Sequence, residues 1–235
     1  MAVVCAGSTT GEAMSANASM TLYRTSVGKK IAMAVTGLLI VAWLFMHMVG
    51  NLLIFAGPEA INSYGEFLQH GSHGAIWVVR AVLLLAIIVH IAAVLSLIRQ
   101  ARAARPVAYE GGRQNQATDA AALSMRYGGL ALFLYIIFHL LHMTTGTLHP
   151  DFVRGDVYHN VVTAFHDWKN VAIYLIALIF LGLHLYHGVF SGFQTLGWDN
   201  ARFRSWRKPF ALGTALVICV GFSLPPLAVA IGIVH

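Results

Sequence analysis

The stretch VAIYLIALIFLGLHLYHGVFSG, residues 171–192, decides the fold of this chain. It contains no Asp, Glu, Lys or Arg, and roughly 20 apolar residues are enough to cross the ~30 Å hydrocarbon core of a bilayer as one helix. In lipid every backbone N–H and C=O must be hydrogen-bonded within the protein, which selects helices over an open sheet. The stretch therefore predicts a transmembrane helix, and it carries two histidines, His184 and His187.

Four similar apolar stretches predict further helices over 30–55, 75–98, 126–147 and 209–234. The composition agrees, because the 235 residues are 58% hydrophobic and 10% charged, with a mean hydropathy of +0.71. We expect an all-α membrane protein with five transmembrane helices in one bundle over 22–235, after a disordered tail over 1–21. Pro225 and Pro226 are expected to interrupt the fifth helix near its outer end.

The positive charges are distributed unevenly about these helices. Of the 15 lysines and arginines, all but Arg80, Arg154 and Lys169 lie before the first helix, between the second and third, or between the fourth and fifth. The positive-inside rule then places the N-terminus in the cytoplasm and the C-terminus outside. These basic residues flank the predicted membrane spans, where they can interact with anionic lipid headgroups. They form no basic face on a soluble domain, so nucleic-acid binding is not expected.

Each of the first four predicted helices contains a histidine well inside it: His47, His90, His139 and His184. An ionisable residue at this depth suggests a functional site. From the rise of a helix, His47 and His139 lie roughly 20 to 25 Å from the cytoplasmic end, and His90 and His184 roughly 12 to 14 Å. The four rings therefore form two layers, each supplied by two different helices.

Two imidazoles from facing helices are a common axial ligand set for haem in a bundle core. We predict two bis-histidine haems, held by His47 with His139 and by His90 with His184. The chain has no C-x-x-C-H, so the haems would be bound non-covalently. Six-coordinate iron has no free position for a substrate and would carry electrons. His142 and His187 follow at i+3 and stay open as alternative ligands, and by depth His142 matches His47 slightly better than His139 does.

Two runs of sequence carry a family resemblance. The first is Ser26-Val27-Gly28-Lys29-Lys30, with Thr36-Gly37 and His47-Met48; the second is His184-Leu185-Tyr186-His187-Gly188, continuing to Gln194-Thr195-Leu196-Gly197-Trp198. Over roughly 22–232 the chain resembles the single-subunit, five-helix cytochrome b anchor of succinate dehydrogenase and fumarate reductase. The resemblance implies two haem b groups, with His139 and His184 rather than His142 and His187 as ligands. It also implies that Gly129 is a small residue where a haem approaches the helix.

The resemblance also implies a function. The chain would be the membrane subunit of a succinate:quinone oxidoreductase in the plasma (inner) membrane of a prokaryote, passing electrons between an iron-sulfur subunit and quinone. Succinate oxidation would reside in a flavoprotein partner, and the whole complex would form a higher oligomer. The chain itself has no dinucleotide fingerprint and no iron-sulfur cysteine set. Its basic inner loops would dock the iron-sulfur subunit, although topology alone explains their charge equally well.

Two other functional classes share some of these features. A di-haem cytochrome b subunit of a hydrogenase, formate dehydrogenase or ferric reductase would share the four histidines. A metal transporter would usually add acidic ligands inside the helices, and the predicted spans contain none.

The sequence leaves open which of the two membrane surfaces holds the quinone site. The outer segment 57–74 supplies Glu66, and an acidic residue in this region serves menaquinone near the outer haem in some relatives. His142 is a second candidate, and Ser26 with Lys30 is the rival placement on the cytoplasmic side. The other outer segment, 147–169, is rich in His and Asp but lacks tight ligand spacing, so we expect a solvated lid loop rather than a metal site.

Overall fold

The computed structural model describes residues 25–71, 74–104, 120–198 and 200–235. The predicted tail over 1–21 lies outside these residues. Every regular element of the described residues is a helix. Five helices are long and apolar enough to cross a membrane: Ser26–Ala56, Ala75–Ala103, Met125–Thr144, Trp168–Thr195 and Arg204–Ala230. The prediction of a five-span, all-α membrane protein is therefore confirmed.

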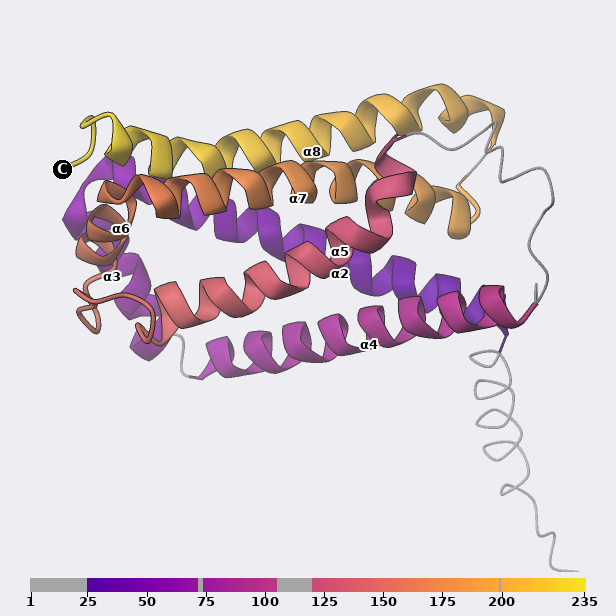
Figure 1. Ribbon diagram of the computed structural model, residues 1–235, viewed down its shortest axis with the longest axis horizontal. Coiled ribbons are helices and arrows are strands. Elements are labelled where there is room, and N and C mark those ends of the chain that lie inside the picture. Colours follow the sequence, from indigo (N-terminus) through magenta and orange to yellow (C-terminus); the bar gives the residue numbers. More distant parts are fainter. Residues whose placement is uncertain (1–24, 72–73, 105–119, 199) are drawn as a thin grey trace, which may run out of the picture.

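The five long helices run side by side in one elongated bundle (Figure 1). They are α2 (Ser26–Leu52), α4 (Ala75–Ala103), α5 (Ala120–His139), α7 (Trp168–Thr195) and α8 (Ala201–Ala230). Helix α7 contacts α8, α5 and α2, whereas α4 packs mainly on α2. The short helices α3 (Pro58–Glu66) and α6 (Val157–His166) lie at the end of the bundle that holds the C-terminus. We call this the α3/α6 end, and the other the Ser26 end.

The fifth span passes through both of its C-terminal prolines. Helix α8 is continuous over Pro225 and Pro226, so the predicted interruption is wrong. Both prolines are buried, and Ala228 and Val229 just beyond them belong to the main core cluster. Packing of this kind lets membrane helices tolerate the hydrogen bonds that proline removes. The helix instead ends at Ala230, because Gly232 adopts φ 75° and turns the chain.

The two segments predicted to lie outside the membrane are more ordered than hydropathy suggests. Residues 57–74 contain α3 and a π-helical turn over Phe67–Gly71. The prediction of a solvated loop over 147–169 is wrong for its second half, because α6 buries one face that includes Val161 and Phe165. A ten-residue amphipathic helix is too short and too polar to resemble a span, although its apolar face covers the end of the bundle.

One side chain joins the two short helices. The Asn62 amide donates to Asp156 Oδ1 at 2.9 Å, and its carbonyl oxygen accepts from the Tyr158 backbone N–H at 2.9 Å. Asp156 also caps α6 by accepting from the His159 N–H. These hydrogen bonds, first from His159 and then from Asn62, hold the pKa of the Asp156 carboxyl below its ordinary 3.8. The link fixes the short helices over the α3/α6 end.

Candidate functional site

The structure brings the four intramembrane histidines into two pairs. The rings of His47 on α2 and His139 at the end of α5 have centroids 6.1 Å apart, with planes at 73°. The rings of His90 on α4 and His184 on α7 have centroids 6.3 Å apart, with planes at 54°. The second pair lies beside Gly37, about ten residues before His47 on α2, so the pairs are separated by roughly 15 Å along the bundle.

The spacing within each pair suits a metal ion between the rings. Imidazole nitrogens lie about 2.0–2.1 Å from a bound metal, and the ring centre lies about 1.1 Å further away, so two axial imidazoles have centroids about 6.3 Å apart. A direct hydrogen bond of about 2.9 Å between two rings would bring the centroids to about 5 Å. The observed 6.1 and 6.3 Å match the first arrangement. The residues present therefore fit a bis-histidine haem iron at both positions.

The two rings of the pair His90 and His184 differ in their hydrogen bonding. His90 Nδ1 lies 3.1 Å from the Met33 carbonyl oxygen, to which it donates. This leaves Nε2 with a free lone pair, the arrangement typical of metal-binding histidines. His184 Nδ1 is buried and has no hydrogen-bond partner among the described residues. A buried polar atom without a partner is costly, so a group that bonded to this nitrogen would remove that cost.

Glycines make room around this second pair. A Cβ on Gly37 would lie 3.3 Å from His90 Cε1, closer than most real contacts. A Cβ on Gly129 would lie 3.9 Å from His184 Cε1. The structure thus places Gly129 beside His184, although it belongs to the same helix as His139. At Gly129 such a Cβ would make an ordinary van der Waals contact, so only Gly37 is tightly constrained by the ring beside it.

The pair His47 and His139 is enclosed by aromatic rings. Trp43 stacks on His47 at 4.8 Å and 13°, and Phe222 from α8 lies 5.5 Å away. The Asn51 amide lies 3.4 Å from His47 Nδ1 and donates to the His47 carbonyl at 2.8 Å. His139 Nδ1 lies 3.2 Å from the Tyr174 hydroxyl. Such surroundings keep water away from the rings and fix their orientation.

The two alternative histidines occupy different positions. His142 lies in the π-helical turn Leu140–Thr144 and is 1% exposed. It stacks between Phe138 and His149, each with a centroid distance of 5.2 Å, rather than on His47. His187 follows His184 by one turn of α7, and the ring that faces His90 is that of His184. The geometry thus pairs the first histidine of each i, i+3 set.

The three candidate quinone residues lie apart. Glu66 is exposed at the end of α3 and lines a polar recess of about 450 Å³ with Glu59 and His70. Ser26 is exposed at the opposite end of the bundle, where α2 begins. His142 is buried near the α3/α6 end. The structure therefore does not assemble these residues into one site.

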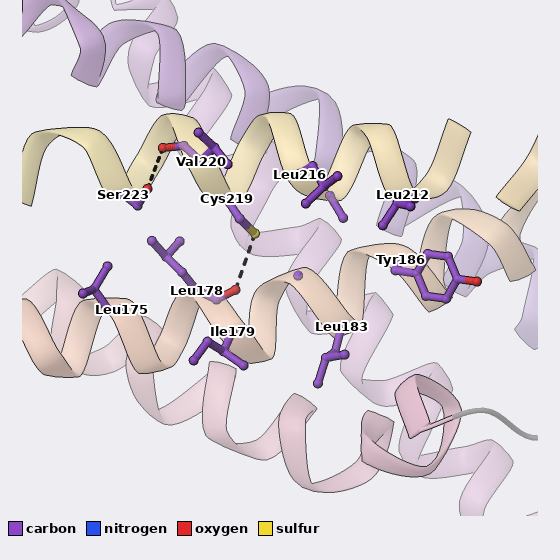
Figure 2. A pocket seen from close by; sticks show the side chains of 12 residues that line it. Leu175, Leu178, Ile179, Leu183, Tyr186, Leu212, Leu216, Cys219, Val220 and Ser223 are labelled. Carbon is purple, nitrogen blue, oxygen red and sulfur yellow. Dashed lines mark hydrogen bonds between the residues drawn. The ribbon is translucent and has the colours of Figure 1, made fainter. Parts of the chain in front are cut away.

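An apolar groove of about 710 Å³ runs between α7 and α8 (Figure 2). Leucines, Ile179, Val220 and Tyr186 line it, and the Cys219 thiol donates to the Leu178 carbonyl at 3.4 Å. None of the four paired histidines is among its lining residues. Its chemistry suits a hydrocarbon chain of the surrounding membrane.

Sequence reasoning did not identify the groups that hold the paired rings. The Met33 carbonyl has no signature in a sequence, because any residue provides one. Tyr174 did carry a signal, since a phenol inside an apolar span needs a hydrogen-bond partner. Its partners could not be named without knowing which face of α7 meets α5.

Comparison with known proteins supports the same family as the resemblance. The family model described as succinate dehydrogenase/fumarate reductase transmembrane subunit matches residues 102–224, which include His139 and His184. No curated protein and no solved structure matches the chain. The match covers more than half of the 235 residues, including two of the five spans in full and most of a third. The chain therefore belongs to the family of succinate dehydrogenase/fumarate reductase transmembrane subunits.

Proposed function

We propose that this chain is the haem b-bearing membrane anchor of a succinate dehydrogenase or fumarate reductase complex, and that it passes electrons between an iron-sulfur partner subunit and membrane quinone. The observation that carries the proposal is the presence of two histidine pairs, His47 with His139 and His90 with His184. Their ring centroids are 6.1 and 6.3 Å apart, and each pair is formed by two different helices. Family membership favours this function over the hydrogenase, formate dehydrogenase, ferric reductase and transporter alternatives.

Four histidines would hold two haem b groups. His90 and His184 form the inner site, nearer the Ser26 end, and His47 and His139 form the outer site. When bound, each haem supplies a one-electron carrier with no open coordination position. The chain contributes the axial nitrogens, fixes the ring planes through the Met33 carbonyl and Trp43, and excludes water with apolar helix faces.

The proposed orientation follows from the charges. Lys29, Lys30 and Arg102 belong to the basic residues of the Ser26 end, whereas Arg80 and Arg154 belong to the α3/α6 end. We place the Ser26 end in the cytoplasm of a prokaryote, with the chain spanning the plasma (inner) membrane, and dock the iron-sulfur subunit there. The flavoprotein bound to that subunit would oxidise succinate, and several copies of the complex would associate.

Menaquinone is the proposed quinone, and either membrane surface can supply its site. Glu66 represents the outer surface, Ser26 represents the inner one, and the buried His142 is a separate candidate near the α3/α6 end. Separate Glu66→Gln and Ser26→Ala variants distinguish the two, because only the variant in the true site should raise the KM for quinone without changing the haem spectrum.

Haem content is the direct test. We would purify the whole complex in detergent, record the reduced-minus-oxidised spectrum and titrate the pyridine haemochrome. Two b haems per anchor chain, with the partner subunits co-purifying, are expected. His90→Ala and His184→Ala should remove the same haem, and His47→Ala the other. A folded complex without haem would refute the proposal.

A further inference from the structure

The hydroxyl of Tyr174 lies between two histidines at the α3/α6 end. It is 3.2 Å from His139 Nδ1 and 3.1 Å from His142 Nδ1. Tyr174 comes from α7, whereas His139 ends α5 and His142 lies in the π-helical turn that follows. One phenol thus contacts both the proposed outer ligand and the histidine that the sequence offered as its alternative.

The surroundings make these contacts strong. Tyr174 is 7% exposed and His142 is 1% exposed. The Tyr174 ring packs edge-on against Phe165 at 4.9 Å and against Tyr135 at 5.3 Å. In such an apolar setting a hydrogen bond is stronger than in water, and neighbouring bonds polarise one another. The hydroxyl therefore acts on both imidazoles without competition from solvent.

Chemistry sets the direction of the hydrogens. An imidazole that binds iron through Nε2 carries its proton on Nδ1, so His139 donates to the Tyr174 oxygen. The hydroxyl has a single hydrogen, which it then donates to His142 Nδ1. In the alternative assignment both imidazoles donate to the Tyr174 oxygen. The hydroxyl hydrogen then has no acceptor among these three groups. The chain runs from His139 through Tyr174 to His142.

We infer that Tyr174 is a positioning residue that orients His139 and, polarised by His142, lowers the reduction potential of the outer haem. This inference rests on the proposed function. An acceptor on Nδ1–H gives the imidazole more anionic character, which stabilises ferric over ferrous iron. At the inner site the Met33 carbonyl oxygen, 3.1 Å away, serves His90 in the same way, with the Thr36 hydroxyl 3.3 Å from the same Nδ1. At the outer site the acceptor for His139 is the Tyr174 side chain, which a mutation can remove.

The test is spectroelectrochemical titration of the purified complex carrying Tyr174→Phe. The equilibrium constant for reducing the outer haem should rise about tenfold, which corresponds to ~59 mV for one electron. The inner haem serves as an internal reference and should not shift. The His47→Ala variant, which should lack the outer haem, shows which redox transition in the titration belongs to which haem. The electron paramagnetic resonance signal of the outer haem should also change, because it responds to the angle between the axial rings.

Tyr135→Phe is the matched control. Tyr135 stacks on His139 at 5.8 Å and 28° and contacts Tyr174, so it loses a hydroxyl in the same cluster. Its potentials should equal those of the wild type. A shift equal to that of Tyr174→Phe would show that cluster polarity, and not the hydrogen bond, sets the potential, which would overturn the inference.

A second variant covers the case in which Tyr174→Phe does not assemble. His142→Leu keeps the phenol but removes the acceptor of its hydrogen, so the outer potential should rise by less than in Tyr174→Phe. An unchanged outer potential in either variant would overturn the inference. A wild-type complex with no haem would instead refute the proposed function, so the two failures are distinguishable.

Discussion

Replacing Gly37 with alanine should weaken the proposed inner haem site at His90 and His184. The new Cβ would lie 3.3 Å from His90 Cε1 and 3.6 Å from His90 Nδ1. Carbon atoms pack best at about 3.5–4.0 Å, so the ring must retreat by a few tenths of an ångström. His90 Nδ1 is already 3.1 Å from the Met33 carbonyl oxygen, and such a retreat would disturb this hydrogen bond and re-aim the other ring nitrogen.

Overpacking of this kind costs about 1–3 kcal/mol. Since 1.4 kcal/mol corresponds to a factor of ten, the affinity of the inner site should fall about 5- to 150-fold if the cost falls on the haem-bound state. The assay is haem content of the complex expressed with limiting haem supply. Gly37→Ala should approach one haem per anchor chain, with the spectral band of the outer haem retained.

Gly188→Ala is the control for a glycine change within a span. It lies on α7, one turn beyond His184, and a Cβ there meets nothing within 4 Å. This variant should keep both haems. If Gly37→Ala also keeps two haems at limiting supply, with an unchanged inner band, then the close approach of α2 to His90 does not constrain the ligand, and the reasoning is refuted.

Three further predictions concern the outer half of the molecule. His139→Ala should leave one haem per chain by pyridine haemochrome, whereas His142→Ala should keep two; the opposite result would make His142 the ligand. Asn62→Ala removes a charge-assisted hydrogen bond to Asp156 and one from the Tyr158 N–H, so local opening of α6 should become easier by about 2–4 kcal/mol, measured as faster amide hydrogen exchange. Unchanged exchange would show that packing alone holds α6. Because the pKa of Asp156 is lowered in the folded state, its contribution is fully present above its ordinary 3.8 and is lost as pH falls through the lowered value. The protection of the α6 amides, measured relative to the intrinsic exchange rate at each pH, should therefore fall in acid, and Asp156→Asn should abolish that step.

The spans could be predicted from sequence because their causes are local. A bilayer requires a long apolar run with internally bonded backbone, and hydropathy detects such runs directly. The ends of the helices were predicted less accurately than the spans, since they depend on polar capping residues. Helix α2 begins at Ser26 rather than near residue 30, because Thr25 Oγ1 accepts the Gly28 N–H and starts the helix early.

The short helices α3 and α6 escaped prediction for the opposite reason. Helix α6 is stabilised by what it covers and by the link from Asn62 to Asp156, which joins residues 94 positions apart. A hydropathy profile averages only residues that are neighbours in sequence, so it cannot detect such a contact. The same holds for Pro225 and Pro226, whose place inside α8 depends on partners from other helices.

By itself the sequence determined the membrane class, the five spans and the two depths of the histidine layers, because helix rise converts residue number into depth. The family resemblance implied His139 rather than His142 as the ligand, but only the tertiary structure showed that the ring of His139 faces His47. Only the tertiary structure, too, decided that Gly129 lies beside His184 and that Tyr174 bridges two histidines. Depth is a one-dimensional property of each helix. Which rings meet depends on how each helix is rotated about its axis and packed against the others, and those contacts join residues far apart in the chain.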